Sequence, residues 1–88
     1  MQDSKKICEL TEAFGRVVYK LRKEANISAR KLSYEMNLSK TTILLSEQGK
    51  LNPQLSTFIK IAEAFYKKPD ELMKMVMDEL PDDWYNEE

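Results

Sequence analysis

Residues 30–52 hold most of the side chains in this sequence that are suited to binding chemistry. Lysine attracts anions and donates to guanine, while hydroxyl and amide groups bond to base edges or phosphate oxygens. The side chains concerned are Arg30, Lys31, Ser39, Lys40, Thr41, Thr42, Lys50 and Asn52. Catalysis lacks its usual groups, because the chain has no histidine and no glycine-rich phosphate loop. We therefore expect a binding protein with no enzyme activity, no cofactor and no metal.

The rest of the sequence predicts a soluble, cytoplasmic protein. The single cysteine, Cys8, cannot form an intrachain disulfide or a cysteine metal cluster, which agrees with a reducing compartment. We interpret it as a small packing residue. Residues 1–6 are polar and no apolar run follows them, so we expect no signal peptide, no transmembrane helix and no membrane partner.

Charge is distributed unevenly along the chain. Residues 1–60 hold 11 Lys and Arg against 6 Asp and Glu, a net charge of +5, and residues 61–88 hold 3 against 9, a net charge of −6, which together give the total of −1. Nucleic-acid binding requires a local basic face rather than a basic total. The isoelectric point near 5.5 therefore weakens that function without excluding it.

Two short helices joined by a tight turn must position the binding residues. Leu32 and Met36 lie four apart on one helical face, and Ile43 follows four residues after Ser39, a residue type that caps helices. Between them, Asn37 marks a corner, because asparagine tolerates the left-handed conformation better than any side chain except glycine. The pattern predicts a helix-turn-helix with helices over about 29–36 and 40–48.

In a helix-turn-helix the second helix enters the major groove of DNA, and its N-terminal residues meet base edges. On that geometry the base-contacting residues are Lys40, Thr41, Leu44 and Leu45. Phosphate contacts position the protein without specifying sequence, and we assign them to Arg30, Lys31, Ser39, Thr42, Lys50 and Asn52.

A longer amphipathic helix precedes this unit. Its apolar residues, spaced three or four apart, are Ile7, Leu10, Phe14, Val18 and Leu21, with Asp3 or Ser4 as cap and an end near Asn26. Gly15 interrupts the helix at a cost of about 1 kcal/mol relative to alanine. We expect it to permit close approach of a neighbouring backbone.

At these residues the sequence resembles the Cro/cI-type (XRE-like) helix-turn-helix transcriptional regulators. The resemblance rests on the apolar positions 32, 36, 38 and 43, on Asn37, and on Glu47-Gln48-Gly49-Lys50-Leu51-Asn52-Pro53, which matches E-x-G-x-x-x-P. It implies an all-α, five-helix, lambda-repressor-like DNA-binding domain in which helices 2 and 3 form the helix-turn-helix. It also implies a structural ion pair between Arg22 and Glu47.

The sequence departs from this family in both helices of the helix-turn-helix. Ala29 replaces a glutamine common in the family, and Ser46 stands where a large apolar residue is usual. Leu44 and Leu45 occupy places that are normally polar and exposed. We expect either a rotation or bend that buries one leucine and exposes Ser46, or two leucines that face a partner.

Two further helices complete the predicted domain. The first carries Leu55, Phe58, Ile59, Ala62 and Phe65 on its inner side, and the next, over about 70–80, has more apolar surface than one face needs. We assign a dimer interface to Met73, Val76, Met77, Leu80 and Trp84. The chain thus divides into a DNA-binding domain with an N-terminal helix extension, residues 1–80, and an acidic tail, residues 81–88.

The sequence therefore predicts a regulator, with repression as the default mechanism, that binds double-stranded DNA as a homodimer. The alternative is a protein-interaction module or an antitoxin that uses the same fold to bind a protein partner, which the two leucines and the acidic tail favour.

Overall fold

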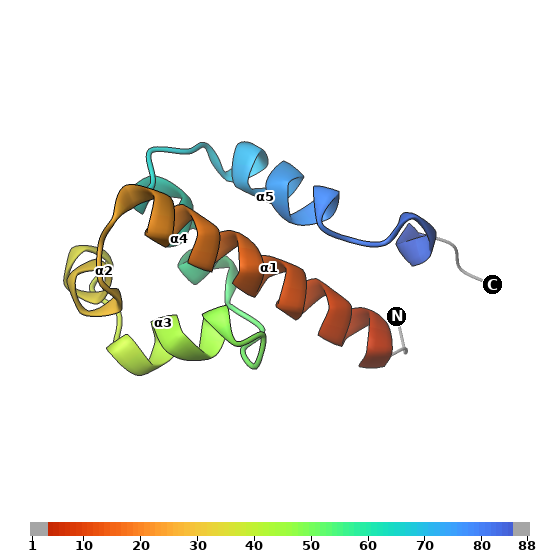
Figure 1. Ribbon diagram of the computed structural model, residues 1–88, viewed down its shortest axis with the longest axis horizontal. Helices are drawn as coiled ribbons and strands as arrows, with labels where there is room; N and C mark the ends of the chain where they lie inside the picture. Colours follow the sequence, from red (N-terminus) through yellow and green to blue (C-terminus); the bar gives the residue numbers. More distant parts are fainter. Residues whose placement is uncertain (1–3, 86–88) are drawn as a thin grey trace.

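A computed structural model describes residues 4–85, which contain five α-helices, one short 3₁₀ helix and no strand (Figure 1). The helices are α1 (Ser4–Ala25), α2 (Ala29–Met36), α3 (Lys40–Glu47), α4 (Leu55–Ala64) and α5 (Pro69–Asp78), followed by the 3₁₀ helix η1 (Asp82–Tyr85). The predicted all-α fold with five helices is confirmed. The predicted cap Asp3 and residues 86–88 of the predicted tail lie outside the described residues.

Helix α1 is the long central element of the fold. Figure 1 shows it crossing the molecule with α3 along one side and α5 along the other, and both helices contact it. Helix α4 packs on α2 and α5. The largest share of the core comes from α1, through the buried residues Ala13, Phe14, Val17, Val18 and Leu21.

The first two turns of α1 are more exposed than the sequence predicts. Thr11 lies level with Gly49, the second residue after α3, so the turns before Thr11 extend past the end of that helix. Ile7 is 38% exposed as a result. The reading of Cys8 as a packing residue is wrong, because its side chain is exposed on this extension.

The inner face of α4 is rotated relative to the prediction. Phe58, Ile61 and Ala62 are buried, a spacing of three and four that faces α2 and α5. Leu55 is 74% exposed and Ile59 is 36% exposed, so their assignment to the inner side is wrong. Leu55 lies in the first turn of α4, at the margin of the core, where no other helix of the described chain covers its side chain.

The apolar stripe of α5 is buried in the chain's own hydrophobic core. Leu72, Val76 and Leu80 recur every four residues and are at most 8% exposed. The assignment of Val76 and Leu80 to a dimer interface is therefore wrong, because the chain's own core covers them. Met73 is 41% exposed, whereas Met77 is half-buried against the core.

The C-terminal segment returns to the start of α1. Trp84 is half-buried there, its Nε1 donates a hydrogen bond to the Lys6 carbonyl at 3.2 Å, and the Lys6 Nζ lies 5.2 Å from the centre of its ring. Figure 1 shows the start of α1 and the 3₁₀ helix η1 at the same end of the molecule. Among the described helices, none is long and apolar enough to cross a membrane.

Candidate nucleic-acid interface

Helices α2 and α3 begin at serine caps. The Ser28 hydroxyl accepts a hydrogen bond from the Lys31 amide at 3.0 Å, and the Ser39 hydroxyl accepts one from the Thr42 amide at the same distance. Each cap satisfies an amide that the first turn of a helix leaves without a backbone partner. The first turns of both helices contain no acidic residue. No carboxylate in these turns therefore neutralises the positive ends of the two helix dipoles.

The turn between the two helices depends on Asn37. This residue is left-handed, with φ 56° and ψ 43°, and the following amide, of Leu38, donates to the Ser33 carbonyl at 3.0 Å. This hydrogen bond, with the left-handed conformation of Asn37, ends α2 within one residue. Three residues after Asn37 the chain is helical again, which fixes the angle at which α3 leaves the turn.

Helix α3 approaches α1 at Gly15. A Cβ atom at this position would overlap the Ser46 carbonyl oxygen and lie 2.8 Å from that of Glu47. Only a residue without a side chain permits this separation, so the predicted role of Gly15 is confirmed. Ser46 is fully buried at the contact, and its hydroxyl donates to the Thr42 carbonyl at 2.8 Å.

The ion pair implied by the resemblance is present between α1 and the end of α3. Arg22 Nε lies 2.6 Å from Glu47 Oε2 and its Nη2 lies 3.0 Å from Oε1, a bidentate pair whose side chains are 12% and 7% exposed. A third bond runs from Arg22 to the Ile27 carbonyl at 3.1 Å. The hydrogen bond to Glu47 raises the pKa of Arg22 despite its burial, so the guanidinium remains charged.

The loop after α3 is tied to α1 by a residue that sequence reasoning missed. The Thr11 hydroxyl lies 3.0 Å from the Gly49 carbonyl and 3.1 Å from the Cys8 carbonyl. Gly49 is left-handed, with φ 75°, and a Cβ there would lie 2.8 Å from Glu12. Its predicted role as a helix stop is confirmed. Nothing in the local pattern around Thr11 indicates this contact, which joins residues 38 apart.

Most predicted contact residues lie on the outer surface of this unit. Those exposed to solvent are Arg30, Lys31, Ser39, Lys40, Thr41, Lys50 and Asn52. Thr42 is half-buried, and its hydroxyl lies 2.8 Å from that of Ser39. Arg30 and Lys40 line one open hollow at the corner between α2 and α3, with Ser33, Tyr34, Asn37, Leu38 and Ser39. Asn52 lines a different hollow, beside α1 and α4.

Comparison with known proteins agrees with this geometry. A family model described as Helix-turn-helix matches residues 18–72, more than half of the chain. The chain belongs to the XRE-type helix-turn-helix family. It is a DNA-binding transcriptional regulator.

A solved structure supports the same membership. The restriction-modification controller protein C.AhdI from Aeromonas hydrophila is 27% identical, with a TM-score of 0.67 over 70% of this chain and 94% of that chain. A search of curated proteins finds no match. The first turns of α1 and the C-terminal segment lie outside the range of the family model.

Two details distinguish this XRE-type domain from the sequence expectation. Ser46 is buried rather than exposed, and its hydroxyl is satisfied by the Thr42 carbonyl of the same helix. Leu44 and Leu45 are both half-buried, and Leu44 packs against the core. The expectations of a bent helix that exposes Ser46, and of two outward-facing leucines, are wrong. The main sequence argument for a protein partner on α3 is thereby removed.

Tyr34 also lines the corner hollow, and sequence reasoning assigned it no role. Its side chain is 78% exposed on α2, one turn after Arg30. The available signal was its i, i+4 spacing from Arg30, which places both side chains on one face of α2.

Proposed function

We propose that α3 enters the major groove of DNA and that its first residues read the base sequence. Lys40 donates to guanine, and Thr41 bonds to a neighbouring base edge. The single observation that carries this proposal is the exposed pair Lys40 and Thr41 at the capped start of α3, in a first turn without acidic residues. Leu44 and Leu45, being half-buried, contribute at most an apolar edge to a thymine methyl group.

Phosphate contacts hold the domain on the duplex in this proposal. Arg30 and Lys31 on α2 and Lys50 after α3 supply the charge, and the amides at the two capped helix starts supply further donors. Ser39, Thr42 and Asn52 are the proposed neutral contacts. Affinity should then decrease steeply with salt, because each neutralised phosphate releases condensed cations.

The regulator acts, in this proposal, as a cytoplasmic homodimer that occludes a promoter and represses it without catalysis. Two recognition helices about 34 Å apart would read the halves of a pseudo-palindromic site in successive major grooves. The likeness to C.AhdI supports a more specific role as the controller of a restriction-modification operon. The described domain, residues 4–80, carries the DNA-binding function, and the tail takes no part in it.

Selection of bound sequences from a random duplex library at moderate salt tests the reading of DNA. We expect an enriched inverted repeat. Lys40→Ala and Thr41→Ala should relax base preference within each half-site. Arg30→Ala and Lys50→Ala should instead weaken binding to all sequences alike, and each should reduce the slope of log affinity against log salt concentration by the contribution of about one phosphate contact.

Lys74→Ala is the matched control for lost charge. Lys74 lies on α5, where it pairs with Asp78 at 3.4 Å, and its loss should change neither preference nor affinity by more than about twofold. Equal effects of all five variants on selected and random DNA would contradict the proposed reading residues.

A further inference from the structure

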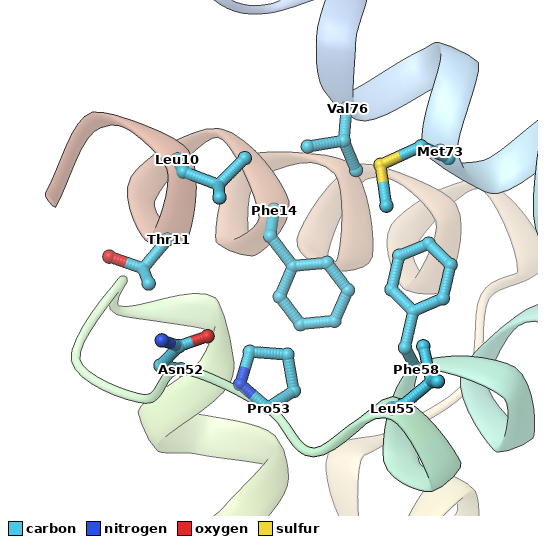
Figure 2. Close-up of a pocket in the computed structure, with 9 residues that line it drawn as sticks. All are labelled: Leu10, Thr11, Phe14, Asn52, Pro53, Leu55, Phe58, Met73 and Val76. Atoms are coloured by element: carbon cyan, nitrogen blue, oxygen red, sulfur yellow. The ribbon is translucent and has the colours of Figure 1, made fainter. Parts of the chain in front are cut away.

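The corner hollow between α2 and α3 differs in charge from the hollow beside α1, α4 and α5. Figure 2 shows the second of these, whose nine lining residues include no charged side chain. The corner hollow is lined by two cations, Arg30 and Lys40, and by no carboxylate. Glu35, the acid of α2, lines a separate hollow between α2 and α4. The corner hollow is therefore suited to an anion.

The donors of the corner hollow are not used within the fold. No residue within 4–85 hydrogen-bonds to, or forms an ion pair with, the side chains of Arg30, Tyr34 or Lys40. The serine hydroxyls beside them are occupied, because that of Ser33 donates to the Arg30 carbonyl at 2.6 Å and that of Ser39 caps α3. A guanidinium, a phenol and an ammonium group thus remain to meet a ligand.

Tyr34 contributes little to the stability of the fold. Its side chain is 78% exposed, so it buries little apolar surface. Tyr19, which is 48% exposed, is by contrast covered by two cations, since Arg22 and Lys23 each lie 5.6 Å from the centre of its ring. Tyrosine is among the neutral side chains that contact DNA phosphates. Its free hydroxyl therefore points to a role in binding.

We infer that the Tyr34 hydroxyl donates a hydrogen bond to a backbone phosphate of bound DNA and that Arg30 pairs with the same phosphate. The two residues are four apart on α2, so both side chains reach one anion from one face of the helix. The hollow extends to Lys40 at the start of α3, so this phosphate borders the bases that α3 meets. That position favours a DNA strand over an acidic protein as the occupant. The inference rests on the proposed function, which places the start of α3 in the major groove.

The two contacts should respond differently to salt. Arg30 neutralises a phosphate and releases condensed cations, whereas the phenol of Tyr34 is a neutral donor. Tyr34→Phe removes only the hydroxyl and should weaken binding by about tenfold at every salt concentration, because a hydrogen bond to a charged group is lost. The slope of log affinity against log salt concentration should stay unchanged. Arg30→Ala should reduce both the affinity and the slope.

Fluorescence anisotropy of a labelled duplex, titrated with the full chain at several salt concentrations, measures both quantities. A phosphate contact carries no sequence information, so the loss in Tyr34→Phe should be the same on a selected site and on a random duplex. A second series replaces one phosphate at a time with an uncharged methylphosphonate along the edge of the selected site. At the contacted phosphate, the wild-type chain and Tyr34→Phe should bind within about twofold of each other.

Tyr66→Phe is the matched control, because Tyr66 is 98% exposed between α4 and α5 and lines neither hollow. It should bind both duplexes as the wild-type chain does. Since both tyrosines are largely exposed, circular dichroism should show unchanged helix content in both variants.

Either of two results would overturn the inference and leave the proposed function intact. The first is binding of Tyr34→Phe within about twofold of the wild-type chain on both duplexes, which would favour an acidic protein as the occupant. The second is a loss that no single methylphosphonate removes. A wild-type chain that selects no sequence contradicts the proposed base reading instead, and the random duplex then still decides the Tyr34 contact.

Discussion

Helices α3 and α5 both pack on α1, but by different means. Helix α5 presents the stripe Leu72, Val76 and Leu80, all buried. Helix α3 buries only Ile43 and Ser46 along its length. Its position comes instead from a backbone contact at Gly15, a bidentate ion pair at its end, and a threonine bond to the loop that follows.

The difference follows from what each helix must do. An apolar stripe tolerates small shifts, because dispersion contacts have little directional preference. Hydrogen bonds and a bidentate ion pair require particular distances and angles. A helix that presents Lys40 and Thr41 to base edges needs its rotation fixed, and the second kind of contact provides that.

The largest expected effect is the loss of the buried ion pair. Glu47→Ala leaves Arg22 charged at a site where it is only 12% exposed, and breaking such a pair costs roughly 3–5 kcal/mol in the free energy of unfolding. Urea denaturation followed by circular dichroism measures it. The hydrogen bond to Glu47 that raises the pKa of Arg22 is lost in this variant, whereas the burial that lowers that pKa remains.

An exposed pair between α1 and α5 is the matched control. Arg16 Nε lies 3.0 Å from Glu79 Oε1, with side chains 54% and 36% exposed. Glu79→Ala should cost less than about 1 kcal/mol, because solvent screens the charges. Similar losses in the two variants would remove the contrast between the two helices.

Gly15→Ala should be nearly as damaging. The added Cβ meets carbonyl oxygens of α3 that cannot move alone, so the helix must shift outward. We expect a loss of about 2–3 kcal/mol, although alanine improves helix propensity by about 1 kcal/mol. Thermal denaturation gives the change. Lys20→Ala, at an exposed position of the same helix, should be neutral within about 0.5 kcal/mol.

Thr11→Val tests the third anchor. Valine keeps the shape but removes the hydroxyl that bonds to the Gly49 carbonyl, at a cost of about 1 kcal/mol. Chemical denaturation against Thr41→Val, where the side chain is exposed, isolates the lost bond. An unchanged midpoint for Thr11→Val would show that the loop is held without it.

On the α5 side of the molecule, one substitution should stabilise the folded protein. Tyr66, between α4 and α5, is left-handed with φ 59°, a conformation that costs an ordinary side chain about 1–2 kcal/mol. Tyr66→Gly should raise the free energy of unfolding by about 1 kcal/mol, and the melting temperature reports it. Asn26→Gly, at φ 56°, should gain less, because asparagine tolerates that region. A larger gain at Asn26 would contradict backbone strain as the cause.

The sequence predicted best those features that local chemistry decides. The caps Ser28 and Ser39 and the left-handed Asn37 each act within three residues, and helix α2 begins and ends where these signals place it. The pairing of Arg22 with Glu47 came from the family resemblance rather than from spacing.

Features that depend on neighbouring helices were predicted poorly. Which face of α4 is buried depends on where α2 and α5 lie, so Leu55 was placed inward and Ile61 was missed. Val76 and Leu80 were assigned to a partner because the sequence does not show how much of α5 the chain covers itself. Ser46 is buried where α3 approaches the backbone of Gly15, 31 positions earlier in the sequence.

Trp84 gives the molecule an intrinsic optical probe. It is the only tryptophan in the chain, and it is half-buried against Lys6 at the start of α1, beyond the range shared with the family. Its fluorescence therefore reports whether the two ends of the chain are docked, while far-ultraviolet dichroism reports the five helices. A change in emission at a lower denaturant concentration than the loss of helix would identify the docked ends as a unit that opens before the DNA-binding core.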